Sequence, residues 1–140
     1  MNTREPIRTG FALPGPGTTG PKSGYDYAQL IGRAATVKPS GEHISLGPFL
    51  PRRGTLVRQL ALADWGSDWL VLTLDEPFEY RGSMIRTFLI RARWIGHPIG
   101  SDFCPVFLLL DRQNSLFTKG KWVSQDFQFE SWAKVEVDPS

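Results

Sequence analysis

Residues 84–95, near the centre of the chain, form a run that is apolar on both faces of a strand yet carries Arg86, Arg91 and Arg93. Successive side chains of a strand point to opposite faces, so Arg91 and Arg93 share a face whose earlier positions are mostly apolar. A helix would gather its polar residues on one side, whereas the four polar residues of this segment are scattered around a helical wheel. We therefore expect a long strand that is buried along its first half and reaches an open rim, or a bulge, in its second half.

Residues 127–137 show the most regular alternation in the chain, which predicts a half-buried strand. The inner face would carry Phe127, Phe129, Ser131, Ala133, Val135 and Val137, and the outer face Gln128, Glu130, Trp132, Lys134 and Glu136. Trp132 thus lies among polar residues. A tryptophan in such a position is typical of an edge cap or a subunit contact, so we predict that Trp132 is an interface residue.

Three further strands are expected in the middle of the chain. Residues 55–62 and 69–74 flank the turn-forming cluster 64–68, which predicts a strand, a tight connection and a second strand. Residues 75–83 contain a proline and a glycine and are predicted to form a loop. The unbroken apolar run 106–110 is typical of a strand that is buried on both faces.

The first part of the predicted domain is ambiguous between helix and strand. Tyr27, Leu30 and Ala34 have helical spacing behind Asp26, a candidate helix cap, whereas residues 33–37 resemble a strand that enters a turn. We expect one short helical turn followed by a strand, with residues 43–46 returning as its partner.

Residues 1–24 are interrupted so often by proline and glycine that neither a helix nor a strand ladder can continue. We predict an extended arm over 1–24, followed by a single domain over 25–140. The apolar residues Phe11 and Leu13 are the expected anchor of the arm. An arm of this length can reach a second copy of the chain, so Phe11 and Leu13 are predicted interface residues.

The predicted elements add up to about seven strands and at most one short helix. This content indicates an all-β protein, namely a small antiparallel barrel or barrel-like sandwich with an extended N-terminal arm. A chain of 140 residues is long enough to bury a self-sufficient core.

The composition limits the cellular compartment that we expect, but it does not identify a binding partner. Sixteen Lys and Arg against 14 Asp and Glu give a net charge of +2, which is far from that of a dedicated nucleic-acid binder. The single cysteine excludes an internal disulfide. Residues 1–10 lack the apolar core of a signal peptide, and the run 106–110 is too short to span a bilayer. We expect a cytoplasmic protein with no membrane partner.

The candidate ligand site lies where the central strand meets its following loop. Arg91, Arg93, Trp94 and His97 are close along the chain. Guanidinium groups match phosphate oxygens, and aromatic faces accept bases, so a small anionic ligand or a single-stranded nucleic acid is a candidate partner.

The alternative interpretation of the same arginines is purely structural. In this interpretation they pair across the hairpin with Asp75, Glu76 and Glu79 and bind nothing. The sequence shows no dense basic groove that would exclude it.

Catalysis would require the segment that contains His97, Asp102 and Cys104. A nucleophilic cysteine needs a positioned base and a group that orients the base. Cys104, however, leads into the most apolar run, where a thiol behaves as a small hydrophobe. His43 and His97 share no metal-ligand spacing. We therefore expect no catalytic residue, no metal and no cofactor.

These observations predict a non-catalytic binding or self-assembly role for a homo-oligomer that associates through its arm or through an edge strand. Two alternatives remain open. The first is a binder of single-stranded nucleic acid or of a phosphate-bearing ligand that uses the basic end of 84–95. The second is a small enzyme that works from the loop between His97 and Cys104.

Overall fold

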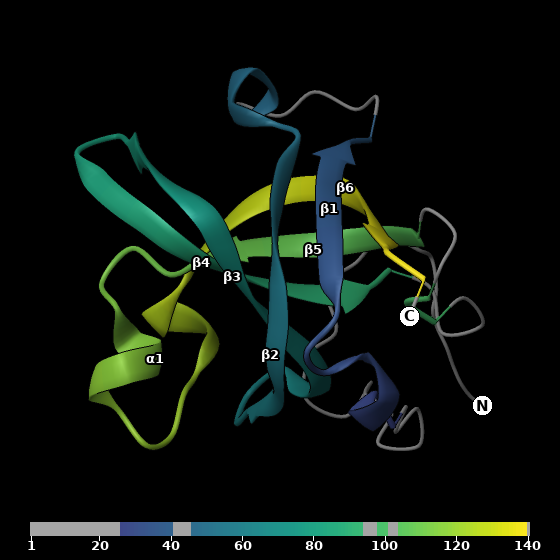
Figure 1. The fold of residues 1–140 in the computed structure, drawn as a ribbon. Helices are drawn as coiled ribbons and strands as arrows, with labels where there is room; N and C mark the ends of the chain where they lie inside the picture. The colour runs from purple at the N-terminus through teal and green to yellow at the C-terminus, as the bar shows by residue number, and fades with distance from the viewer. Residues whose placement is uncertain (1–25, 41–45, 94–97, 101–103, 140) are drawn as a thin grey trace.

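The computed structural model describes residues 26–40, 46–93, 98–100 and 104–139. The strands of these residues form one closed antiparallel barrel, in which the order around the barrel follows the chain and β6 pairs back onto β1 (Figure 1). They are β1 (Ala34–Pro39), β2 (Arg52–Leu62), β3 (Gly66–Tyr80), β4 (Ser83–Ala92), β5 (Cys104–Leu110) and β6 (Gln128–Val137). The short helical segments are η2 (Ala28–Leu30), η3 (Gly47–Phe49), α1 (Ser115–Thr118) and η4 (Ser124–Asp126). The predicted all-β barrel is confirmed.

The start of the barrel is a helical turn followed by a strand, as predicted. The Asp26 carboxylate accepts a hydrogen bond of 3.0 Å from the Ala28 amide, at the beginning of η2. β1 then pairs with β2 and β6. Of the partner strand predicted over 43–46, only Leu46 is described, and it forms a turn before η3. The six strands of the described residues are therefore one fewer than the expected seven.

The loop predicted over residues 75–83 is wrong, because β3 continues through it to Tyr80. A two-residue turn, Arg81 and Gly82 with φ of 51° and 84°, then leads into β4. Pro77 can lie inside β3 because the pairing register with β4 shifts between Thr73 and Phe78. Proline, which has no amide proton, is tolerated in strands at such irregularities.

An apolar cluster fills the interior of the barrel, and side chains from all six strands contribute to it. Its members include Ala35, Val37, Leu56, Leu70, Leu72, Phe88, Ile90, Val106, Leu108, Leu110, Ala133, Val135 and Val137. Each large aliphatic side chain that is buried in this way stabilises the fold by about 1.5–3 kcal/mol. The alternation expected for the last strand is confirmed at Ala133, Val135 and Val137.

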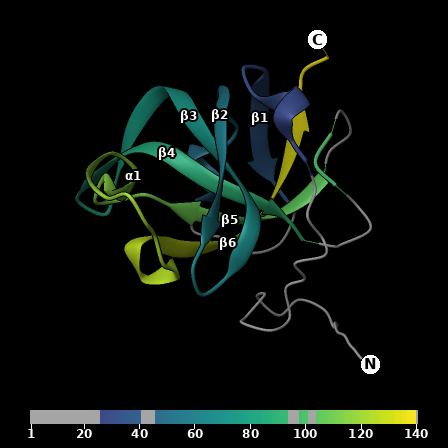
Figure 2. The same cartoon turned by 90° about the horizontal axis from the view of Figure 1, so that it is seen from below.

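A second apolar cluster lies on the outside of the barrel wall. Residues of β2 to β5 meet the connection between β5 and β6 there, and the cluster contains Leu60, Leu62, Trp69, Val71, Leu89, Phe107, Leu109, Leu116, Trp122 and Phe127. Both views place α1, which belongs to this connection, outside the barrel beside β4 (Figure 1; Figure 2). This cover explains why β3 and β5 are apolar on both faces.

Phe127 belongs to this outer cluster, which corrects its predicted place on the inner face of the last strand. β6 begins one residue later, at Gln128, and Phe127 is the C-cap of η4. The register between β5 and β6 also shifts between Leu108 and Leu109, so that strict alternation does not extend back to Phe127.

Among the described residues, no helix combines the length and the apolarity needed to cross a bilayer.

Candidate functional site

Arg91 lies on the outside of β4 and is buried, with 7% of its surface exposed. Its guanidinium carbon is 5.9 Å from the centre of the Trp69 ring, and its Nη1 donates a hydrogen bond of 3.2 Å to the Trp65 carbonyl. Trp65 in turn stacks on Trp69 with ring centres 6.4 Å apart. The expected open rim at the second half of this strand is therefore wrong at Arg91, because two tryptophans cover it.

Arg93 follows the end of β4 and lies on a different tryptophan. Its guanidinium carbon is 4.1 Å from the centre of the Trp132 ring, and the Trp132 ring centre is 4.7 Å from that of Phe107. A guanidinium over an indole face is attracted by the ring quadrupole. The backbone fixes the arrangement as well, since the Arg93 amide donates a hydrogen bond of 2.8 Å to the Pro105 carbonyl.

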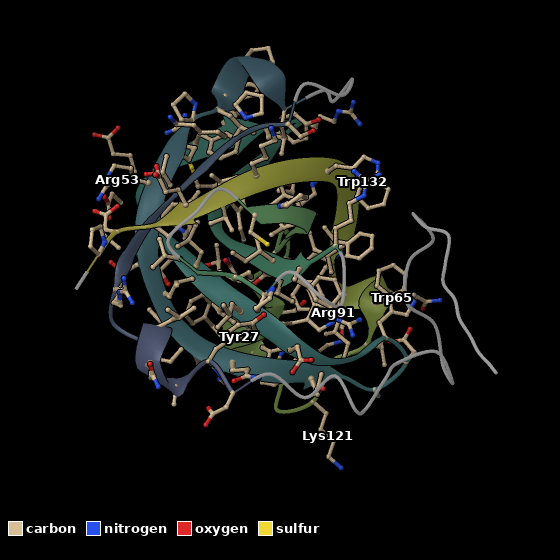
Figure 3. The ribbon with its side chains drawn as sticks, turned by 90° about the vertical axis from the view of Figure 1, so that its right-hand side faces the viewer. Tyr27, Arg53, Trp65, Arg91, Lys121 and Trp132 are labelled. Carbon is tan, nitrogen blue, oxygen red and sulfur yellow. The ribbon has the colours of Figure 1, made fainter. Side chains whose placement is uncertain are left out.

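The strand registers place Arg91 and Arg93 in two neighbouring rows of residues that run across the strands of the barrel. In the first row, Arg91 pairs with Phe107, which pairs with Trp132. We call the six residues Trp65, Trp69, Arg91, Arg93, Phe107 and Trp132 the arginine–tryptophan wall. Trp132, Arg91 and Trp65 lie on the same side of the barrel (Figure 3).

In the second row, the backbone of Arg93 bonds to Pro105, Pro105 pairs with Lys134, and Lys134 pairs with Lys38. Both lysines are exposed on the outer face, because the neighbouring Val37 and Val135 point into the barrel. We call Lys38 and Lys134 the lysine pair. Together they bring two positive charges to the outer face of β1 and β6.

The structure brings together three of the residues that the sequence singled out. Arg91 and Arg93, predicted as ligand-binding residues, share the wall with Trp132, predicted as an interface residue. The other predicted site residues, Trp94, His97, Phe11 and Leu13, lie outside the described residues. The aromatic partners Trp65, Trp69 and Phe107 and the lysine pair were missed, because only the register of distant strands makes them neighbours.

The structural alternative, in which the arginines pair with the hairpin carboxylates, does not match the geometry at Glu79. Glu79 pairs with Met84 at the start of β4. Arg91 is seven residues farther along β4, about 23 Å at the usual rise of a strand. The arginines instead contact tryptophans.

Cys104 belongs to the inner cluster and is 1% exposed. Burial raises the pKa of its thiol to about 11, so the group remains a neutral thiol near pH 7. Only the thiolate is a nucleophile, and the proposed helpers His97 and Asp102 lie outside the described residues. Cys104 therefore packs as an apolar side chain.

Within the described part of the chain, no three His, Cys, Asp or Glu side chains gather in a way that could hold a metal ion. Comparison with protein-family models, curated proteins and solved structures finds no match. The function therefore has to be inferred from the geometry of the wall.

Proposed function

We propose that this is a non-catalytic binding protein that holds an anionic partner against the outer face of β4, β5, β6 and β1. The observation that carries the proposal is the pair of rows described above, one rich in aromatic rings and the other cationic. Guanidinium and indole groups supply charge and contact area, but they neither accept protons nor attack as nucleophiles near neutral pH. Their chemistry supports binding alone.

A phosphate-bearing chain such as single-stranded nucleic acid is the partner class that fits these rows best. Single-strand binders combine a cationic track for the phosphates with aromatic side chains for the bases. Here Arg93 and Phe107 already contact Trp132, so the aromatic row is largely used within the protein. We therefore expect the cations to dominate, with strong dependence on salt and weak dependence on base sequence.

The test is fluorescence anisotropy with a fluorescein-labelled oligothymidine of about 12 nucleotides, measured over a range of NaCl concentrations. Contacts from Arg93, Lys38 and Lys134 would give a slope of log K against log salt of about −2, at about −0.7 for each phosphate neutralised on a single strand. The double variant Lys38→Gln/Lys134→Gln should bind about tenfold more weakly and reduce the slope to about −0.7.

The matched control is Arg86→Gln/Lys121→Gln, which removes the same charge from two exposed positions outside the wall and the lysine pair. It should bind as the wild type does. Equal loss in both double variants would show attraction to net charge alone, and binding that ignores salt, or no binding, would overturn the proposal.

A further inference from the structure

A polar pocket lies at the opposite end of β5 from the lysine pair. It has a volume of about 270 Å³, and Ser83, Arg112, Gln113, Gln125, Asp126 and Gln128 line it together with Phe127. The turn between β3 and β4, the beginning of the connection after β5 and the beginning of β6 meet there. The pocket shares no residue with the arginine–tryptophan wall.

The guanidinium of Arg112 is held in one orientation by acceptors from both neighbouring strand ends. Nε and Nη2 donate to Ser83 Oγ at 3.2 and 3.1 Å, Nη2 donates to the Arg81 carbonyl at 2.8 Å, and Nη1 donates to Gln128 Oε1 at 2.8 Å. An arginine has five N–H groups in a rigid fork. These four bonds to described residues leave one Nη1 hydrogen for a further acceptor, and the orientation of the fork is fixed before any ligand arrives.

The Asp126 carboxylate in the pocket forms hydrogen bonds with residues other than Arg112. Asp126 accepts a hydrogen bond of 2.5 Å from Lys119 Nζ and one of 2.9 Å from the Val123 amide. These bonds lower the pKa of Asp126. Its negative charge is therefore offset by Lys119, and the positive charge of Arg112 is left as the net charge of the pocket.

The other residues that line the pocket offer several hydrogen-bond donors. The amides of Gln113 and Gln125 are on exposed residues, and the Ser83 hydroxyl accepts from Arg112 and can still donate. A net positive charge with several N–H and O–H donors is complementary to an oxyanion. The volume is slightly below the usual range for small-molecule sites, which suits a low-mass ligand.

We propose that this pocket binds the carboxylate or phosphate group of a small ligand, with Arg112 as the anchoring cation and Gln113 and Gln125 as flanking donors. The site is separate from the arginine–tryptophan wall, with which it shares no residue, and it lies at the opposite end of β5 from the lysine pair.

The experiment is a titration of ¹⁵N-labelled full-length protein, followed by amide chemical shifts, with inorganic phosphate in one series and acetate in another. We expect saturable shifts centred on residues 112, 113, 125 and 128, and the tighter series identifies the source of the oxyanion. Arg112→Lys keeps the charge but loses the fork, and it should weaken binding about tenfold. Lys38→Gln/Lys134→Gln should leave this binding unchanged.

Gln113→Ala/Gln125→Ala provides a second test that does not disturb Arg112, because both glutamines are exposed. It should also weaken binding, and it decides the question if Arg112→Lys fails to fold. Shifts that never saturate, that spread over all basic residues, or that are unchanged in both variants would overturn the proposal.

Discussion

The guanidinium carbon of Arg93 lies 4.1 Å from the centre of the Trp132 ring, which joins the end of β4 to β6 across the intervening strand β5. Phe107 of β5 contacts the same indole. Three neighbouring strands are thus tied together on the outside of the barrel by one tryptophan, at the place where the sequence pattern expected a subunit contact.

The first prediction concerns Trp132. Its replacement by leucine should lower the free energy of unfolding by about 1–3 kcal/mol, because both the cation–π contact and the aromatic pair are lost. Urea denaturation followed by circular dichroism measures the change. Phe117→Leu is the control, since Phe117 is 67% exposed and should change stability by no more than about 0.5 kcal/mol. Equal effects would show that the contacts of Trp132 contribute nothing specific.

The second prediction tests whether the side-chain volume of Arg91 or its charged group stabilises the fold. Arg91→Ala should destabilise the protein by about 2–4 kcal/mol, because it opens a cavity beside Trp69 and removes the donor to the Trp65 carbonyl. Arg91→Met keeps most of the volume and should cost less than about 1.5 kcal/mol. Thermal unfolding of both variants, with the exposed Arg86→Ala as control, is the measurement. A methionine variant as unstable as the alanine variant would mean that the guanidinium itself is required, through its charge or its hydrogen bond to the Trp65 carbonyl.

The third prediction concerns acid stability at Asp126. Hydrogen bonds from Lys119 and from the Val123 amide lower the pKa of this carboxyl. A lowered pKa contributes stability above the unfolded-state value of about 4, and that contribution is lost as the pH falls through the folded-state pKa. Asp126→Asn should therefore flatten the decline of the unfolding free energy below about pH 4. The readout is urea unfolding at a series of acidic pH values.

Glu79→Gln, which removes an exposed carboxyl on β3, is the control for this pH series. It should follow the wild-type profile. If it flattened the profile as much as Asp126→Asn does, the contact with Lys119 would not be the cause.

The fourth prediction concerns the reactivity of Cys104. Because burial raises the pKa of the thiol to about 11, iodoacetamide at pH 7 should label the folded protein far more slowly than the urea-unfolded protein. Mass spectrometry counts the adduct. Rapid labelling of the native protein would reopen the alternative of an enzyme that uses this cysteine.

The fifth prediction concerns assembly. Closure of the barrel gives each of the six described strands a neighbour on both sides, so none of them is an edge strand. Association through an edge strand would need an open edge, whereas association through the N-terminal arm would not. We expect the full chain to be oligomeric and the chain without residues 1–22 to be monomeric, as measured by light scattering. An unchanged mass would remove the arm from the assembly.

The strands themselves could be anticipated because alternation, unbroken apolar runs and turn-forming clusters are local properties of the chain. Each of these predicted strands overlaps a strand of the barrel, namely those over 33–37, 55–62, 69–74, 106–110 and 127–137. The prediction failed at Pro77, where a local rule against proline in strands was overridden by the shifted register between β3 and β4.

Local patterning is enough to predict the buried face of β6 at Ala133, Val135 and Val137, since the hydrophobic effect acts on each side chain according to its place in the alternation. The packing of the whole barrel, in contrast, places Lys134 opposite Lys38, Arg93 over Trp132, and Arg112 within hydrogen-bond distance of Ser83 and Gln128. These neighbours depend on the register of strands far apart in the chain. The register is set by packing the whole barrel interior at once, so no local pattern records it.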